Sequence, residues 1–181
     1  MKDKELLTTI RNLMLDSNNG MPSKGFDSLN YLVMDQPLQQ GIESNPTIYY
    51  SIVSDKAYGF ISRKNKWDSL NQVMVHEETQ VYITRIQYMG WRVRTADPNE
   101  FTANDIIRAL RDLFISEWFL LKCKEYDINV LRIQEINNVP ISDDQERFNY
   151  LPSFDAKFIH KNVWVNSINY ITDIYGNIKR V

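Results

Sequence analysis

The chain has 181 residues, of which 43% are hydrophobic and 24% charged, and its net charge is −2. This size and composition suit one compact domain spanning residues 1–181 and argue against a disordered or low-complexity protein. The near balance of charge disfavours a protein that binds nucleic acid through bulk positive charge. Cys123 is the only cysteine, which excludes an internal disulfide and a cysteine-based zinc site. No apolar run approaches the roughly 18 residues that span a bilayer, so we expect a soluble chain, made in a reducing compartment and without membrane contact.

The first predicted element is a short amphipathic helix near the N-terminus. Its apolar side chains recur at spacings of three and four, as Leu6, Leu7, Ile10, Leu13 and Met14. Residues 17–28 contain Asn19-Gly20 and Pro22, which are typical of turns. We therefore expect a loop there, followed by a strand at residues 29–34.

From residue 47 the pattern becomes typical of strands. Residues 48–53 and 80–88 are rich in Tyr, Val, Ile and Thr, and both predict strands. Between them, residues 54–67 mix basic and aromatic side chains, and we expect a projecting hairpin or extended loop with a basic tip, whose flanks could pair as strands. Such a mixture is typical of nucleic-acid contacts, and a protein interface or a solvated tip explains it too. The candidate interface residues here are Lys56, Tyr58, Phe60, Arg63, Lys64, Lys66 and Trp67.

A long helix is the clearest element of the second half. Thr102 and Asp105 have the spacing of a capping box, with Asp in place of the usual Glu. The apolar face that follows predicts one helix over about residues 102–126, packed against the sheet. That face comprises Ile106, Ile107, Leu110, Leu113, Phe114, Trp118 and Leu121, interrupted by Glu117.

The remaining elements are strands and a loop. Residues 128–133 predict a strand, and residues 137–146 predict a loop because they begin Asn-Asn-Val-Pro and continue with acidic side chains. Residues 147–159 predict a strand in which Pro152 indicates a bulge or an edge, and residues 163–171 predict another. The order of elements favours an α+β fold with a mostly antiparallel sheet, one long helix at about 102–126, and an N-terminal helix packed on it.

A search for chemistry finds no catalytic constellation. His76 and His160 are 84 positions apart without a neighbouring metal ligand, and we interpret both as surface or strand-end residues. Two lysines flank Cys123 and could activate its thiol, but its position favours an ordinary, partly buried cysteine. Glycine-rich phosphate loops, serine nucleophile elbows and the H-E-x-x-H motif are absent. We therefore expect no enzyme, cofactor or metal, and a protein that works by association.

The predicted loop at 137–146 carries the other candidate interface residues, Asp143, Asp144, Glu146 and Arg147. Its carboxylates are ligands that Mg²⁺ or Ca²⁺ could use. However, no glycine supplies the sharp turn of a calcium loop, and Arg147 follows at once. A solvated loop that leads into the next strand is the favoured interpretation.

From residue 78 onward the layout resembles the tail terminator, or neck terminator, proteins of tailed bacteriophages. The resemblance is carried by the order and spacing of the strand 80–88 closing on Met89-Gly90-Trp91, the helix from Thr102, the strand 130–133, and the acidic loop with the strand after it. It covers about half of the chain, and residues 36–71 have no counterpart in it.

The resemblance implies a structural virion protein of the tail or neck, assembled in the host cytoplasm. It implies a homo-hexameric ring that caps the tail tube, stops its polymerisation and provides the docking surface for the head or neck. The implied partners are the tail tube protein, a head-completion or neck protein, and a sheath protein if the tail is contractile. Genomic DNA would pass transiently through the ring, and the slightly acidic balance of charge is compatible with such a passage.

Other functions stay open at this stage. A head-completion or adaptor subunit of the head-tail connector is the main alternative, and it differs from a terminator in its docking face. A small enzyme predicts a pocket of converging titratable groups, whereas a nucleic-acid binding module predicts a salt-sensitive complex.

Overall fold

The computed structural model describes residues 1–33, 45–70, 73–92, 100–142 and 148–167. The elements, in chain order, are α1 (Asp3–Met14), the 3-10 helix η1 (Pro22–Lys24), β1 (Asn30–Val33), β2 (Thr47–Asp68), β3 (Val73–Trp91), α2 (Ala103–Ile115), α3 (Glu117–Glu125), β4 (Asn129–Ile133), β5 (Asn137–Ser142) and β6 (Phe148–Ser167). None of the helices in these ranges is both long and apolar enough to cross a membrane.

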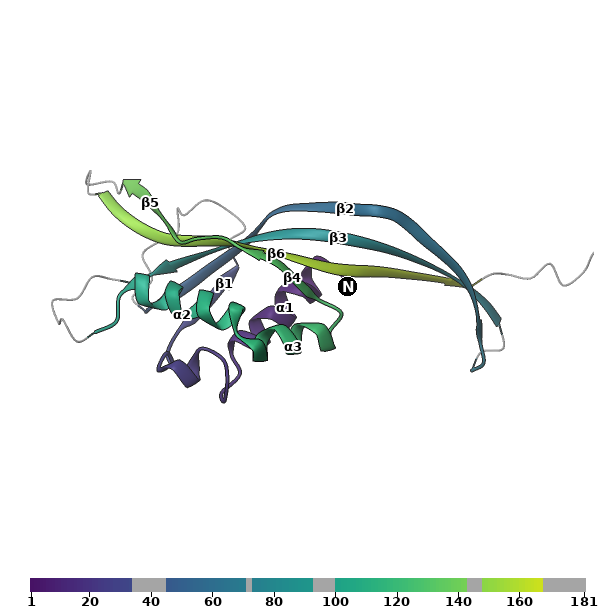
Figure 1. Cartoon of the computed structure of the whole chain (residues 1–181), viewed down its shortest axis with the longest axis horizontal. Helices are drawn as coiled ribbons and strands as arrows, with labels where there is room; N and C mark the ends of the chain where they lie inside the picture. Colours follow the sequence, from purple (N-terminus) through teal and green to yellow (C-terminus); the bar gives the residue numbers. More distant parts are fainter. Residues whose placement is uncertain (34–44, 71–72, 93–99, 143–147, 168–181) are drawn as a thin grey trace, which may run out of the picture.

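The six strands form one sheet in the order β1-β2-β3-β6-β4, and β5 also pairs with β6. Strand β1 runs parallel to β2, and the other pairs are antiparallel. The three helices lie on one face of this sheet (Figure 1). The prediction of an α+β fold with a mostly antiparallel sheet is therefore confirmed.

The core lies between the helices and the central part of the sheet. Tyr88 of β3 and Phe154 of β6 stack with ring centroids 5.4 Å apart, and Phe114 of α2 meets both rings edge-on. Phe119 of α3 stacks on Phe114 at 4.6 Å. All four rings are buried, so aromatic packing contributes to the attachment of α2 and α3 to the sheet.

Helix α1 follows the predicted amphipathic pattern. Its buried side chains are Leu6, Ile10, Leu13 and Met14. All four belong to the same hydrophobic cluster as the sheet residues. The prediction of an N-terminal helix packed into the fold is confirmed.

The prediction of one long helix over 102–126 is wrong, because the helix breaks at Ser116. The predicted start is confirmed, since Thr102 and Asp105 cap each other's main-chain N–H groups. Ser116 has extended backbone (φ −62°, ψ 144°), and its hydroxyl accepts a hydrogen bond from the Phe119 N–H, which starts α3 as a new helix. The buried face therefore shifts to Phe119 and Cys123, and Leu121 is exposed.

Two further predictions about the second half are corrected. The start of the predicted loop at 137–146 is strand β5, which pairs with the first residues of β6. Pro140 is tolerated there because β5 pairs with β6 alone among the described strands, so its other side needs no N–H donor. Residues 163–167 continue β6 without a break, instead of starting a new strand.

Pro152 lies at a position that suits the prediction of an edge. Its partner on β5 is Asn138, and the pairing between β6 and β3 begins only at Ser153. At Pro152 the inner strand β6 therefore has a single neighbour among the described residues.

Candidate assembly arm and the pocket at its base

Three strands extend beyond the helices as a long ribbon, which we call the arm (Figure 1). The arm consists of residues 55–68 of β2, 73–82 of β3 and 160–167 of β6, with β3 in the middle. Every residue of β2 from 55 to 67 is exposed. A strand exposed on both faces gains little from hydrophobic burial. The arm is therefore not part of the core, and such an exposed surface is typical of an interaction site.

The prediction of a separate hairpin at 54–67 is wrong, although the projection of this segment is evident in Figure 1. These residues form a single strand that pairs with β3 from Ser54↔Arg85 to Trp67↔Met74. The chain reverses only after Asp68 and before Val73. The basic residues Lys64 and Lys66 lie in the last part of β2, opposite Glu77 and Val75, close to this reversal.

A bulge between Tyr58 and Ser62 interrupts the pairing of β2 with β3. Gly59 has φ +74°, a conformation that glycine adopts without strain. The buried amide of Gln80 donates hydrogen bonds to the carbonyl oxygens of Tyr58 (3.1 Å) and Val81 (3.0 Å). Gln80 thus donates to carbonyl oxygens at the edge of the bulge.

The arm exposes large apolar side chains on both outer strands. On β2, Phe60 is 100% exposed, Tyr58 61% and Trp67 54%. On β6, Trp164 is 38% exposed and Val165 58%. Exposed aromatic side chains on strands with an unpaired outer edge are typical of protein–protein contacts.

The polar groups of the arm are only partly paired. Arg63 of β2 forms an ion pair with Glu78 of β3 at 2.9 Å. Lys56, Lys64 and Lys66 make no ion pair with any described residue. Lysines on an exposed strand edge oppose aggregation with other strands. These three lysines could also form ion pairs with an acidic surface of a partner.

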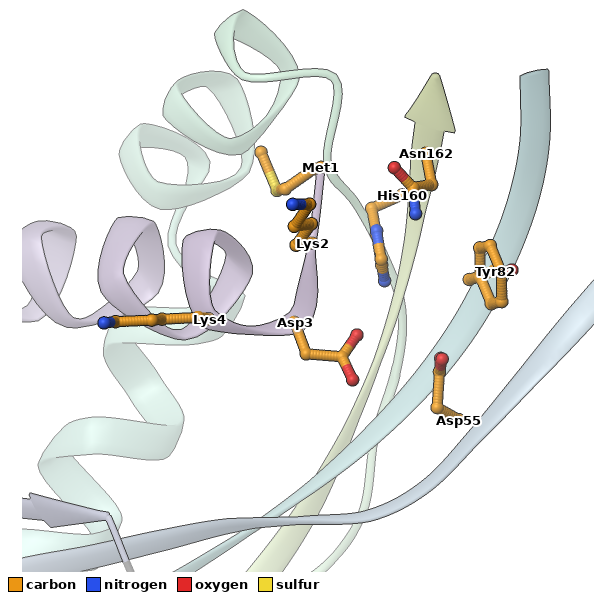
Figure 2. Close-up of a pocket in the computed structure, with 8 residues that line it drawn as sticks. All are labelled: Met1, Lys2, Asp3, Lys4, Asp55, Tyr82, His160 and Asn162. Carbon is orange, nitrogen blue, oxygen red and sulfur yellow. The ribbon is translucent and has the colours of Figure 1, made fainter. Parts of the chain in front are cut away.

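A pocket of about 420 Å³ lies where the arm leaves the body of the protein. Figure 2 shows its lining, with the side chains of Asp3, Asp55 and His160 directed toward one another from α1, β2 and β6. Tyr82 of β3 stacks on the imidazole of His160 at 5.9 Å. The N-terminal ammonium group donates to the carbonyl oxygen of Lys161 at 2.5 Å, which places the start of α1 beside this site.

His160 is buried, so the interpretation of both histidines as surface or strand-end residues is wrong for His160. The Thr84 hydroxyl lies 2.5 Å from Asp55 Oδ1 and 2.9 Å from His160 Nε2. Since a carboxylate only accepts, the single hydroxyl proton goes to Asp55, and His160 donates from Nε2. Burial lowers the pKa of His160 below its ordinary value, and the Asp55 carboxylate opposes that shift.

His76 behaves differently and lies on the arm. It is only partly buried on β3, and its Nδ1 is 2.8 Å from the side-chain oxygen of Asn65 on β2. In the pairing of β3 with β6, His160 lies opposite Tyr82. His76 is six residues away from Tyr82 along β3, further out on the arm, which fits the prediction that the two histidines do not form a shared site.

Cys123 is fully buried on α3, so the prediction of a partly buried thiol underestimated its burial. Burial raises the pKa of Cys123 to about 12, which leaves the thiol protonated at neutral pH. The alternative of a thiol activated by Lys122 and Lys124 is therefore not supported.

Comparison with known protein families decides the identity of the chain at the level of family. Residues 5–170 match the family model described as E217 gateway protein gp29. The chain belongs to this gateway protein family. A comparison with curated proteins found no match. Gateway proteins are a family of phage structural proteins, so the chain is a structural protein of the phage virion, with a role in the head and tail region.

The gateway family confirms the phage part of the sequence interpretation and leaves the terminator part a prediction. Of the candidate interface residues, the seven on β2 lie together on the arm. The other four, Asp143, Asp144, Glu146 and Arg147, lie outside the described residues. Sequence reasoning missed the pocket because its ligand-type side chains are far apart in the chain and only the strand register unites them.

Proposed function

We propose that this gateway-family protein assembles with itself into a ring of six that terminates the tail tube, and that it acts by association rather than by catalysis. The observation that supports this proposal best is the arm. Thirteen consecutive residues of β2, numbers 55–67, are exposed in the single subunit. Burial of these side chains would stabilise the protein only when a partner covers the strand. The resemblance to tail terminators gives the number of copies.

The arm provides the two different surfaces that a closed ring requires. In a ring, each contact joins one patch of a copy to another patch of its neighbour. Strand β1 pairs with β2 only at residues 47–50, so the outer edge of β2 from residue 51 to 68 has no strand beside it in the described part of the chain. On the far side, β4 pairs with β6 only up to Ile159, so the edge of residues 160–167 that faces away from β3 has no strand beside it in the described part of the chain. We assign these two edges to contacts between neighbouring copies.

The remaining surfaces are assigned to the partners of a terminator. One face of the ring would contact the tail tube protein and the other a head-completion or neck protein, with a sheath protein alongside if the tail is contractile. Genomic DNA would pass through the lumen, where a chain of net charge −2 does not trap it.

A head-completion or adaptor subunit of the connector is the second candidate. The description of the family as gateway proteins supports this candidate to the same extent, because a gateway suggests a passage between head and tail. Both candidates use the arm for association and differ in the partner that they dock.

Light scattering combined with electron microscopy of the purified chain tests the ring, alone and with tail tubes added. The variants Tyr58→Lys and Phe60→Lys place a charge on the arm, and Leu121→Lys places one on α3, where the side chain is 52% exposed. We expect rings for the wild type and Leu121→Lys, and loss of rings for both arm variants at unchanged Tm. Arm variants that assemble like the wild type would contradict the assigned interface, and a chain that stays monomeric on tubes would contradict the ring.

Phage particles made without the protein separate the two candidates. A missing terminator leaves tubes without a stop signal, so overlong tails without heads are expected. A missing adaptor leaves tails of normal length that fail to join heads, and this result would select the second candidate.

A further inference from the structure

The pocket at the base of the arm contains a cluster of metal-ligand side chains. Asp3, Asp55 and His160 each present one ligand atom, and these atoms all lie within 4.8 Å of one another. The three residues come from α1, β2 and β6, and Figure 2 shows them converging on one space. The cluster therefore depends on the assembled fold and not on a local sequence motif.

Positive groups also line this pocket, namely the N-terminal ammonium of Met1, Lys2 and Lys4, but none of them forms an ion pair with either carboxylate. Asp55 accepts a hydrogen bond from Thr84, yet neither Asp3 nor Asp55 forms an ion pair with a described residue. Lys4 also lines the pocket, but Figure 2 shows its side chain pointing away from the two carboxylates. Two carboxylates brought this close repel each other, and a bound cation relieves that repulsion.

His160 gives a second and independent indication of a ligand. It is 2% exposed, and its Nδ1 is buried without a hydrogen-bond partner among the described residues. Buried polar atoms are nearly always paired, so an unpaired imidazole nitrogen in a polar pocket calls for an explanation. The hydrogen bond to Thr84 and the stacking on Tyr82 fix the ring in place without using this atom.

We propose that Asp3, Asp55 and His160 form a binding site for a first-row transition-metal dication of the Zn²⁺ type. One imidazole and two carboxylates are ligands that Zn²⁺ accepts, with a fourth position left for water. Mg²⁺ and Ca²⁺ prefer oxygen ligands throughout, so the imidazole selects against them. Exposed Asp3 can move to close the ligand distances, because it lies at the first turn of α1 with its side chain in solvent.

The proposed ion would join the start of α1 to β2 and β6 at the base of the arm. It would thereby fix the direction in which the arm leaves the body. This inference does not rest on the ring, because it concerns the single subunit.

Zn²⁺ binding to the chelator-treated chain at pH 7.5 tests the proposal, followed by calorimetry and thermal unfolding. Any affinity tag belongs at the C-terminus and must be removed, because Met1 and Lys2 line the pocket. We expect one Zn²⁺ per chain and a rise in Tm of about 5–10 °C at a hundredfold excess over Kd. Mg²⁺ at the same concentration is expected to cause no shift.

Asp3→Asn and Asp55→Asn preserve side-chain size and are each expected to lower Zn²⁺ affinity at least about tenfold. Asp27→Asn, at an exposed aspartate in the loop before β1, is the matched control and is expected to bind like the wild type. Binding that survives in the Asp3→Asn, Asp55→Asn double variant would place the metal elsewhere and overturn the proposal.

The two histidines of the chain allow a direct readout by nuclear magnetic resonance. Zn²⁺ is expected to shift the imidazole nitrogen signals of His160 and to leave those of His76 unchanged. Unchanged His160 signals at saturating Zn²⁺ would overturn the site, whether or not the subunit forms rings.

Discussion

Gly90 of β3 lies so close to Ile107 of α2 that a Cβ at Gly90 would be 2.5 Å from the Ile107 Cγ1 atom and 2.9 Å from the Ala103 carbonyl oxygen. This contact lets α2 approach the sheet closely enough for its aromatic side chains to reach β3 and β6. We expect Gly90→Ala to destabilise the fold by about 1–3 kcal/mol, because neither neighbour can move without disturbing packed main chain. Chemical denaturation measures this loss.

A double-mutant cycle tests whether the Gly90 effect arises at Ile107. Ile107→Ala alone removes a fully buried side chain and is expected to cost about 2–5 kcal/mol. The Gly90→Ala, Ile107→Ala variant should be less destabilised than the sum of the single changes, because the clashing methylene is gone. Strictly additive losses would show that contact with the Ala103 carbonyl, and not with Ile107, limits the approach.

Phe114 is the centre of the aromatic core, since its ring contacts Tyr88, Phe119, Phe154 and Phe158. Phe114→Ala is expected to lower the free energy of unfolding by about 3–5 kcal/mol. Leu121→Ala, at an exposed position of α3, should change it by less than about 0.5 kcal/mol. Equal effects of the two changes in denaturant titrations would contradict this description of the core.

Ser116 separates α2 from α3 by capping the second helix. Ser116→Ala removes the hydroxyl that accepts from the Phe119 N–H, and the expected loss of stability is about 1 kcal/mol. Ser116→Asp keeps a capping oxygen and should retain most of the stability. Thermal unfolding of both variants checks this, and an alanine variant as stable as the wild type would mean that core packing alone fixes the break.

The pH dependence of stability should report His160. Its folded pKa is lowered by burial, so the unfolded chain takes up this proton near pH 6.5 while the folded chain takes it up only at lower pH. Stability is therefore full above about pH 7 and falls as the pH drops from there through the folded pKa. Hydrogen bonds from the Thr102 main chain and side chain lower the pKa of Asp105. Protonation of Asp105 therefore reduces the stability of the fold only below about pH 4.

Denaturant titrations between pH 7.5 and pH 5, in the presence of chelator, measure this effect. His160→Gln is expected to be less stable at every pH but to lose less stability across this range than the wild type. Identical losses in the two proteins would assign the pH dependence to other groups.

The features of the structure that sequence reasoning predicted well are those determined by residues close together in the chain. The capping pair Thr102 and Asp105 and the apolar spacing of α1 act within a few residues, so their effects are visible in the chain. The break at Ser116 was missed because the surrounding side chains continue a helical apolar pattern. In the structure the break coincides with the Ser116 cap of α3 and with the stacking of Phe119 on Phe114.

Features that depend on distant partners could not be predicted. The arm lacks the alternation of a half-buried strand, because neither face of β2 from 55 to 67 is covered. β5 contains Asn137, Asn138 and Pro140, which favour a loop, and becomes a strand only because β6 lies beside it. The pocket needs Asp3, Asp55 and His160 to meet across 157 positions of sequence, and no spacing rule reports that.

Strand β6 runs without interruption from the layer where Phe154 and Phe158 pack to the end of the arm. A pull on the tip along the strands would therefore load the hydrogen bonds between β6 and β3 in shear, and the tension would reach the aromatic layer directly. The arm is thus anchored in the interior of the subunit through β6, and a force applied by a neighbour at its tip would be transmitted to the aromatic core beneath the helices.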